Sequence, residues 1–313
     1  MIQRALPWIV ALLLLAAPAL LTPYTFDLLL RIMVLAVFAL SLELLVGMTG
    51  LVSLGHAAFL GIGAYVTVLL SPQYDPGNAL VLLLLAAGIA ALYALFVGAL
   101  SLRTKGVYFI MVTLAFAQMA YFVFHDTPIG RGTDGIYLTA RPIVGAFDAE
   151  NRTHLYYLVA GTLILTYALL ALLRRSRFGH ALAGIRVNEQ RMRAVGFATY
   201  AYKLAAFVIA GALAGVAGFL LAVKDGFVNP ELLSWHESGA VLLMIILGGI
   251  GHLRGAVLGA AAFVLLKELY ASPDLVGSLS EHWQLTLGLT IIAFVALLPK
   301  GLIGLPARLK GRR

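Results

Sequence analysis

The sequence predicts an all-α membrane protein, a bundle of about ten transmembrane helices, and three observations support this fold class. The 313 residues are 62% hydrophobic and only 12% charged, whereas about a quarter of the residues of a soluble domain are charged. The apolar residues form continuous blocks such as residues 79–100, and about 20 apolar residues cross the hydrocarbon core as a helix. The short alternating segments of a membrane barrel are missing, and open strands would leave unpaired edge groups in lipid.

Ten apolar segments follow one another along the chain. The predicted spans are residues 6–21, 28–46, 51–70, 79–100, 107–124, 154–173, 204–223, 237–250, 256–270 and 284–298. The eighth and ninth spans are short, which indicates either little tilt or a position along a protein-buried cavity rather than in lipid. Neither a low-complexity segment nor a soluble domain interrupts the series, so we expect residues 1–313 to form a single transmembrane domain.

The first span has two interpretations. Arg4 precedes its apolar run, and Ala16, Ala17 and Ala19 resemble the cleavage site of a secretory signal peptide. We expect the segment to be retained as a helix, because an even number of helices places both termini on the same side of the membrane. The distribution of basic residues supports that arrangement.

Lysine and arginine residues gather on one side of the predicted topology, which the positive-inside rule assigns to the cytoplasm. They are Arg4, Arg103, Lys105, Arg174, Arg175, Arg177, Arg186, Arg191, Arg193, Lys203, Arg254, Lys300, Arg308, Lys310, Arg312 and Arg313. Both termini and a loop of about residues 174–203 are therefore expected in the cytoplasm. The external loop of about residues 125–153 is close to neutral. The net charge of +8 thus reflects membrane topology, and nucleic acid is not an expected partner.

Glycine is frequent between residues 47 and 65, although each glycine costs a helix about 1 kcal/mol relative to alanine. The glycines indicate either close helix packing or a broken helix that exposes backbone groups to a solute path. Ser53 and His56 supply polar groups at such a break and are candidates for that path. His56 is equally well interpreted as a packing residue that forms a hydrogen bond across helices. The candidate packing glycines of this segment are Gly55, Gly61 and Gly63.

Small residues at four-residue spacing predict further tight helix contacts. Gly211 and Gly215 form one such pair in the seventh span. Two overlapping pairs around the eighth and ninth spans consist of Gly251, Gly255 and Gly259. Gly-His dipeptides at positions 55 and 251 also begin two small-residue segments, which indicates either a duplicated half of the chain or a chance similarity.

A carboxylate, that of Glu43, lies within the second predicted span. An ionisable group inside the membrane is costly, and it is therefore a candidate functional group. Its position about a turn from the cytoplasmic end favours a role at the interface or in helix pairing. A proton relay through Glu43 would instead indicate a secondary transporter.

The basic cytoplasmic loop contains a predicted short helix. Asn188 can cap a helix of residues 189–195, and Gly196 can end it. Glu189, Arg191 and Arg193 would lie on this helix outside the membrane. The loop is interpreted either as a solvated segment that fixes the topology or as a docking helix for a cytosolic partner.

Catalytic and cofactor motifs are missing from the sequence. Cysteine is absent, which excludes disulfides and thiolate metal sites. We find no G-x-x-x-x-G-K-[ST] phosphate cradle, no H-E-x-x-H pair and no nucleophile elbow. We therefore predict that the chain is not an enzyme, holds no metal, and leaves any ATP and Mg²⁺ to another chain. The turn-rich residues 130–136 form either a surface turn or a contact for an external donor.

Residues 50–65, G-L-V-S-L-G-H-A-A-F-L-G-I-G-A-Y, resemble the hallmark of LivM-type permeases of branched-chain amino-acid ABC transporters. The resemblance extends along most of the chain. Further similar segments are residues 113–116 followed by Gln118, residues 132–135, 177–179, 185–189 with Gly196, 203–218, 247–251 and 301–305. Several ordered motifs therefore agree with the predicted helices.

This resemblance implies the fold of a type II ABC importer and a multi-pass permease in the inner membrane of a prokaryote. The implied partners are a LivH-like second permease, two cytosolic ABC ATPases and a periplasmic or external solute-binding protein. The residues implied at the ATPase contact are Arg186, Asn188, Glu189, Arg191, Arg193 and Gly196. The candidate translocation path consists of Ser53, His56, Gln118 and Glu43. Thr133 and Asp134 would contact the external binding protein.

Two features depart from the family pattern. Glu43 stands where related proteins often carry an amide, and Gln190 and Arg191 replace the alanines of the importer pattern E-A-A-x-x-x-G. Related permeases also carry urea or short amides, so this solute class is an alternative to branched-chain amino acids. A secondary transporter or channel that works without an ATPase is a further alternative, and it would depend on Glu43 or His56.

Overall fold

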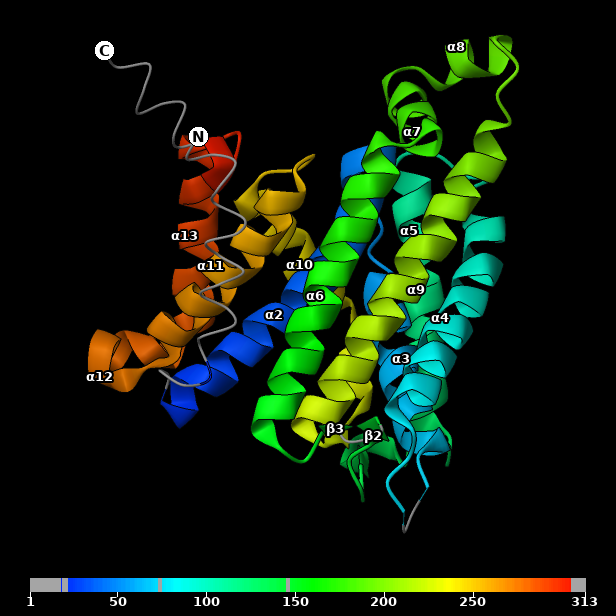
Figure 1. Cartoon of the computed structure of the whole chain (residues 1–313). Helices are drawn as coiled ribbons and strands as arrows, with labels where there is room; N and C mark the ends of the chain where they lie inside the picture. The colour runs from blue at the N-terminus through cyan, green and yellow to red at the C-terminus, as the bar shows by residue number, and fades with distance from the viewer. Residues whose placement is uncertain (1–17, 19–21, 73–74, 145–146, 305–313) are drawn as a thin grey trace.

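The computed structural model describes residues 18, 22–72, 75–144 and 147–304, and the described residues form an α-helical bundle. Its apolar helices coincide with the second to tenth predicted spans, and the first predicted span lies outside the described residues apart from residue 18 (Figure 1). These helices are α2 (Pro23–Glu43), α3 (His56–Leu70), α4 (Ala79–Ser101), α5 (Val107–Asp126), α6 (Arg152–Arg175), α9 (Thr199–Asp225), α10 (Trp235–Gly248), α11 (Leu253–Ala271) and α13 (Trp283–Leu297). Three shorter helices are α7 (Arg177–Val187), α8 (Glu189–Ala194) and α12 (Pro273–Val276).

Two small antiparallel strand pairs lie at the end of the bundle opposite α7 and α8 (Figure 1). β1 (Ile136–Tyr137) pairs with β4 (Phe227–Val228), and β2 (Ile143–Val144) pairs with β3 (Phe147–Asp148). The first pair joins the loop after α5 to the end of α9.

Six helical stretches of the described residues are long and apolar enough to cross a membrane, or seven if α10 and α11 form one bent span. α10 and α11 are bent by 116° at the turn between them. α3 has 15 residues, about 22 Å of helix, and is too short to cross a core of about 30 Å alone. The chain is therefore a multi-pass α-helical membrane protein, while the total of about ten spans stays a prediction.

Two shorter helices begin inside the bundle. After α2 the chain forms a π-helical turn, η1 (Leu44–Thr49), reverses at Gly50 (φ 75°) and returns as residues 51–55 before α3. In the opposite direction, α9 ends at Gly226 (φ 66°), and residues 227–234, which include the 3₁₀ turn η3 (Pro230–Leu233), return before α10 (Figure 1). Both reversals use left-handed backbone, which glycine adopts without a steric penalty. The two halves of the chain therefore share one pattern of long helix, reversal and short helix.

The Gly-His dipeptides do not mark this repeat. The first begins α3, whereas the second precedes α11, and the counterpart of α3 in the second half is α10. Their similarity is therefore a coincidence of sequence.

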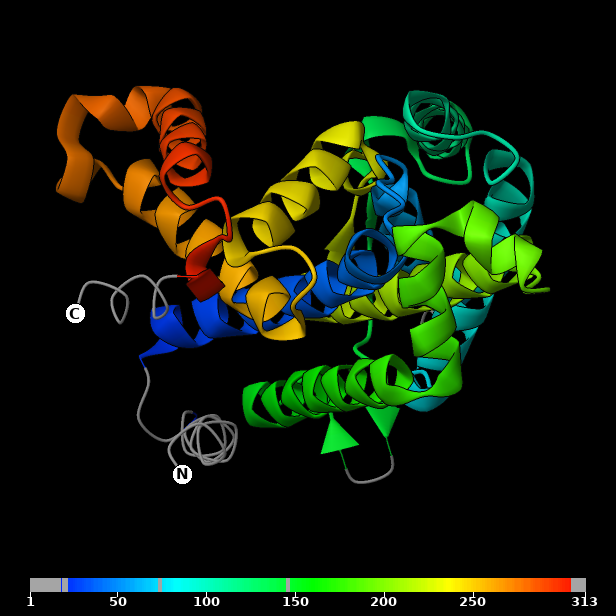
Figure 2. The same ribbon diagram turned by 90° about the horizontal axis from the view of Figure 1, so that it is seen from above.

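The two halves exchange their long helices. α9 packs against α3 and α4, whereas α2 packs against α10 and α11. In α2–η1 and in α9, 78% of the most apolar window is buried, against 17% to 39% in the other single candidate spans. Figure 2 shows the same arrangement from above, with α2 and α9 running through the middle of the bundle. These two helices form the centre of the described structure.

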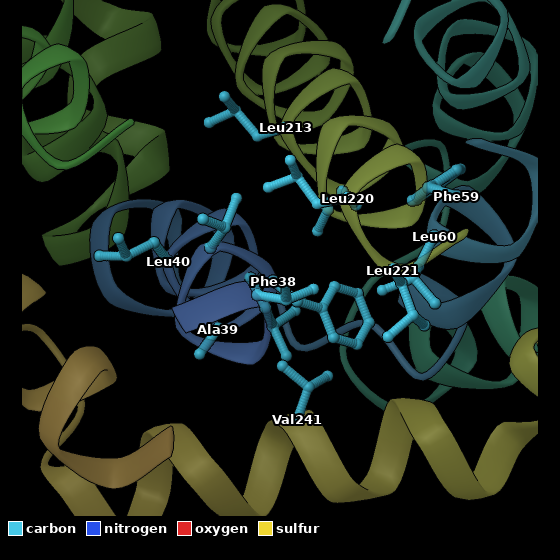
Figure 3. Close-up of a cluster of buried hydrophobic side chains, with 14 of the residues drawn as sticks. Phe38, Ala39, Leu40, Phe59, Leu60, Leu213, Leu220, Leu221 and Val241 are labelled. Atoms are coloured by element: carbon cyan, nitrogen blue, oxygen red, sulfur yellow. The ribbon is translucent and has the colours of Figure 1, made fainter. Parts of the chain in front are cut away.

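Apolar side chains of both halves meet between the central helices (Figure 3). Phe38 of α2, Leu220 of α9 and Val241 of α10 are each at most 1% exposed. The Phe59 ring of α3 packs edge-on against the Phe207 ring of α9, with 5.6 Å between the ring centroids. Phe207 lies eight residues, or about two helical turns, after Thr199, the first residue of α9. The start of α3 therefore packs against α9 about two turns from its beginning.

Glycines allow the backbones of these helices to touch. A methyl group on Gly63 of α3 would overlap the backbone of Gly215 in α9, and one on Gly218 would overlap the backbone of Leu60. Corresponding overlaps with backbone or side-chain atoms occur at Gly55, Gly61, Gly211, Gly255 and Gly259. Gly251 differs, because it lies in the α10–α11 turn with φ 90° and no atom closer than 3.7 Å to a methyl group placed on it. At this position glycine is favoured by the left-handed backbone of the turn rather than by close packing.

Gly63→Ala should destabilise the protein, because the added methyl group meets rigid backbone. We expect a loss of about 1–3 kcal/mol in the free energy of unfolding, as for other overpacked interiors. Gly88→Ala in α4 is the matched control, because no atom lies within 4 Å of the added group. Thermal unfolding of the purified variants in one detergent measures the difference. Equal unfolding midpoints for the two variants would contradict the close-contact interpretation.

Candidate functional site

The loop between α6 and α9 folds as two short helices that lie outside the bundle (Figure 1). Ser176 caps α7 by accepting a hydrogen bond from the Gly179 N–H (3.2 Å). Asn188 caps α8 through its side-chain oxygen, which accepts from the Arg191 N–H at 2.9 Å. Gly196, in left-handed backbone (φ 94°), follows the end of the helix. α8 is thus a capped helix at the residues where the sequence indicates one.

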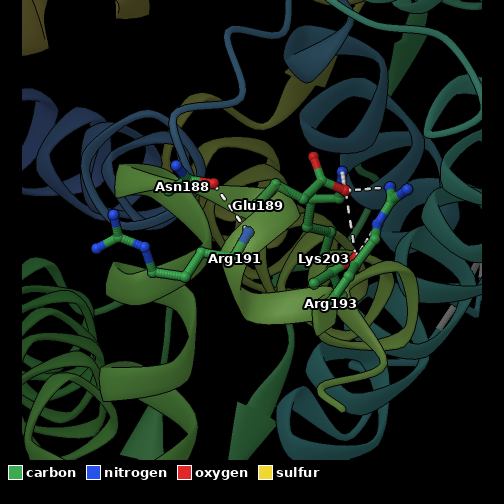
Figure 4. Close-up of polar contacts among 6 residues, drawn as sticks. Asn188, Glu189, Arg191, Arg193 and Lys203 are labelled. Atoms are coloured by element: carbon green, nitrogen blue, oxygen red, sulfur yellow. Dashed lines mark hydrogen bonds and ion pairs between the residues drawn. The ribbon is translucent and has the colours of Figure 1, made fainter. Parts of the chain in front are cut away.

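The carboxylate of Glu189 holds α8 against the start of α9 (Figure 4). It accepts from Arg193 Nη2 at 2.5 Å, from Lys203 Nζ at 2.9 Å and from Thr199 Oγ1 at 3.2 Å. Partial burial alone would raise the pKa of Glu189, but the hydrogen bonds from Lys203 and Arg193 outweigh it and lower that pKa to about 2. The negative charge of Glu189 is therefore used within the chain.

The surface of α8 that remains open is basic and apolar. Arg191 is exposed, and its side chain points away from the Glu189 cluster (Figure 4). Val187 and Val195 flank the helix and are 84% and 71% exposed. A partner that approaches this end of the bundle would meet Arg191 and the two valines rather than the Glu189 carboxylate.

A second cluster connects α7 to the buried end of α2. The Arg186 guanidinium donates a hydrogen bond to the Gly47 carbonyl oxygen in η1. One turn earlier, Glu43 is 2% exposed, and its Oε1 accepts from the Gly251 N–H at 2.6 Å. A methyl group on Gly47 would overlap the Glu43 carboxylate, so this position needs glycine. We call Arg186, Gly47, Glu43 and Gly251 the α2 junction, because they join α7, α2 and the α10–α11 turn.

The candidate path residues Ser53 and His56 lie at the buried start of α3, where both are 0% exposed. His56 Nε2 lies 2.8 Å from Ser41 Oγ, which donates its own hydrogen to the Phe38 carbonyl oxygen. The Ser41 hydroxyl therefore accepts from His56, so Nε2 of the imidazole carries a hydrogen. Nδ1 of His56 has no hydrogen-bond partner within the described part of the chain.

The starts of α3 and α10 touch at the same place. The Ala57 N–H in the first turn of α3 donates to Ser238 Oγ in α10 at 2.9 Å. Sequence reasoning missed Ser41 and Ser238, although each is a hydroxyl residue within an apolar span. Gln118 is separate from this group, because it lies partly exposed on α5. The structure therefore brings together Ser41, His56 and Ser238.

The predicted external contact residues lie at the other end of the bundle. Thr133 and Asp134 are exposed in a 3₁₀ turn, η2 (Gly132–Asp134), between the left-handed residues Arg131 and Gly135. β1 follows directly and pairs with β4 at the end of α9. The turn is thus attached to one of the two central helices.

Replacing Glu43 should separate its hydrogen-bonding role from its charge. Glu43→Leu leaves the partly buried Gly251 N–H without its acceptor, so we expect a loss of about 1–3 kcal/mol in the free energy of unfolding. Glu43→Gln keeps an acceptor oxygen and should lose less than half as much. Thermal unfolding midpoints of the two variants in one detergent give the comparison. A leucine variant as stable as the unmodified chain would show that the hydrogen bond is dispensable.

The depressed pKa of Glu189 predicts how stability changes with pH. Its contribution is fully present above the ordinary carboxyl pKa of 4.5 and is lost as the pH falls toward about 2. Glu189→Gln should therefore lower the unfolding temperature at pH 7 but have little effect near pH 2. Asp75→Asn is the control, because Asp75 is exposed and forms no hydrogen bond among the described residues. A Glu189→Gln effect that does not vary with pH would contradict the ion-pair explanation.

Comparison with known proteins matches the chain to a transport family. Residues 24–295 match the family model described as branched-chain amino acid transport system, permease component. The chain is 31% identical over 322 residues to the high-affinity branched-chain amino acid permease protein LivM of Escherichia coli K12, with 95% of this chain and 74% of the relative covered. It is 30% identical to LivM of Salmonella typhimurium, with 87% and 68% covered.

Similarity extends to relatives named LivH, which are also high-affinity branched-chain amino acid transport system permease proteins. LivH of Escherichia coli K12 is 24% identical over 291 residues, which cover 87% of this chain and 91% of the relative. No solved structure gives a significant match. The family model spans most of the helices described above, from the start of α2 to near the end of α13. The chain therefore belongs to the family of permease components of branched-chain amino acid transport systems.

Proposed function

We propose that the chain is the membrane-spanning permease subunit of an ATP-driven importer for branched-chain amino acids. It would receive the solute from an external binding protein and release it into the cytoplasm. The observation that carries the proposal is the capped helix α8, which lies at one end of the bundle in a chain of this permease family. Its exposed Arg191 and valines provide a surface for a cytosolic partner.

The proposed assembly contains four kinds of subunit. A LivH-like permease completes the transmembrane part, two ABC ATPases bind on the side of α8, and a solute-binding protein contacts Thr133 and Asp134 on the other side. The chain carries no phosphate-cradle motif, so ATP and Mg²⁺ belong to the ATPases and the chain itself is not the catalyst. The match to LivH relatives supports the expectation of a second permease of similar fold.

The proposed topology has about ten spans, with both termini in the cytoplasm of a prokaryotic cell and the chain in its inner membrane. α7, α8 and the turn before α11 lie at one end of the bundle (Figure 1). The basic residues of this end support a cytoplasmic location. In this topology residues 51–55 with α3, and residues 227–234 with α10, each complete one crossing.

The proposed path lies between the two permeases, so each contributes one side. The spans of this chain offer few charges to bind both ends of an amino acid. Selection of the solute is therefore assigned to the external binding protein, and the path itself binds weakly. Ser53, His56, Gln118 and Glu43 remain candidates along it. His56 and Ser53 are fully buried in this conformation, so they would reach solute only after the starts of α3 and α10 separate.

The α2 junction provides a route for coupling. A displacement of α7 and α8 by the ATPases acts through Arg186 on η1, and through Glu43 on the α10–α11 turn. In each contact a side chain bonds to a backbone group, that of Gly47 in η1 or that of Gly251 in the α10–α11 turn, so movement of α7 would reach the backbone at these two points.

Affinity purification of the chain from its native membrane, followed by mass spectrometry, tests the assembly. We expect an ATPase, a second permease and ATP-dependent uptake of branched-chain amino acids after reconstitution. Solute movement by the chain alone, without ATP, would instead support the secondary transporter.

Arg191→Glu tests the proposed docking surface of α8 without disturbing the Glu189 cluster. A reversed charge at a docking contact is strongly unfavourable, so retained ATPase and ATP-dependent uptake should both fall roughly fivefold or more. Arg152→Glu, at the opposite end of the bundle, makes the same charge change and should alter neither quantity. The measurement is the ATPase-to-permease ratio by quantitative mass spectrometry together with uptake in proteoliposomes. Normal coupling in Arg191→Glu would remove α8 as the docking element.

A further inference from the structure

A basic cavity opens between the end of α6 and the start of α11, on the side of the bundle that carries α7. It has a volume of about 500 Å³. Five basic side chains line it: Arg174, Arg175, His180, His252 and Arg254. No acidic side chain lines it. The cavity therefore concentrates the charges of three arginines from the end of α6 and the start of α11, with two histidines beside them.

This positive charge is not neutralised inside the chain. Among the described residues, none of the three guanidinium groups of Arg174, Arg175 and Arg254 forms an ion pair. Glu43 interacts with Arg174 electrostatically. Its Oε1 is, however, bonded to Gly251, and the residue is 2% exposed. An anion from outside the chain can therefore pair with the cavity.

The cavity changes from polar to apolar along α6. Tyr167 and Ala171 precede Arg174 on one face of the helix at spacings of four and three residues, and all three line the cavity. Leu253 and Ile303 add apolar wall. α11 begins at this point without a side-chain cap, so its first N–H groups favour an anion as well. An anionic group with an apolar continuation matches this gradient.

Exposed leucines also lie on both helices outside the lining of the cavity. Leu165 and Leu172 of α6 are 69% and 68% exposed, and Leu258 and Leu265 of α11 are 49% and 50% exposed. α6 and α11 are in contact with each other. Such exposed leucines on candidate membrane helices are suited to acyl chains rather than to water.

We propose that this cavity binds the phosphate headgroup of an anionic phospholipid, whose acyl chains lie along α6 and α11. The side chains of residues 305–313 offer no complementary charge, because four of them are basic and none is acidic. An acidic protein surface would satisfy the arginines but would leave the apolar wall and the leucines uncovered. Anionic lipids are attracted to basic clusters at the cytoplasmic surface of membrane proteins.

Such a lipid would join elements that the α2 junction also joins. His180 belongs to α7, and His252 belongs to the α10–α11 turn. A headgroup held between them adds an attachment of α7 to the bundle beyond that made by Arg186. The composition of the membrane would then affect how firmly α7 is held.

Native mass spectrometry of the purified full chain, with any subunits that it retains, tests the proposal. The protein is titrated with phosphatidylglycerol or with phosphatidylcholine of the same acyl chains. We expect preferential retention of phosphatidylglycerol, weakened roughly tenfold or more in the double variant Arg175→Gln/Arg254→Gln. The control Arg103→Gln/Lys105→Gln removes the same charge from another loop and should retain the lipid. Thermal unfolding verifies that both double variants fold.

Four results would overturn the proposal. Equal binding of the two lipids would show that the charge of the headgroup is not recognised. Equal loss in both double variants would leave only general electrostatic attraction. Displacement of the lipid by inorganic phosphate at millimolar concentration would identify a site for free anions instead. Loss of an ATPase subunit from Arg175→Gln/Arg254→Gln with lipid retention unchanged would identify this surface as a protein interface.

Discussion

Direct contact between helix backbones is the constraint on which the rest of this structure depends. Lipid tails are as apolar as leucine, so helices in a bilayer associate through close packing rather than through exclusion of water. Gly63 and Gly218 allow α3 to lie directly on α9, and Gly248 and Gly259 do the same between α10 and α11. These contacts fix both short helices inside the bundle. The buried hydrogen bond from Ala57 to Ser238 joins the starts of these two helices.

α2 connects the two polar groups of the interior. Ser41 bonds to His56 at the start of α3, and Glu43, two residues later, bonds to Gly251 in the turn before α11. Arg186 reaches the same helix from α7. The segment formed by α2 and η1 therefore contacts three parts of the structure. They are α7, the start of α3, and the turn between α10 and α11. A motion imposed at α7 has a short physical route to the start of α3.

The sequence predicted the helices well and their arrangement poorly. Continuous apolar runs locate the described membrane helices, and Asn188 with Gly196 delimits α8, because both signals are local. The 116° bend between α10 and α11 and the exchange of α2 and α9 depend on contacts between distant residues, which apolar composition does not encode. Local signals also failed to show that Glu189 pairs with Lys203, 14 residues away and outside the helix. Ser41 and Ser238 went unnoticed because a single hydroxyl in an apolar span has no distinctive spacing.

The exchange of long helices has a consequence for biosynthesis. Glu43 and Gly251, which share a hydrogen bond, are 208 residues apart in the chain. At ribosomal rates of about 5–20 residues per second, α2 is therefore synthesised about 10–40 s before Gly251. During that interval α2 has left the ribosome with a carboxylate and a hydroxyl near one end and without α10 or α11. α3 and α4 wait in the same way for α9. Membrane insertion of this chain therefore needs an environment that shelters half-assembled polar helices until the second half arrives.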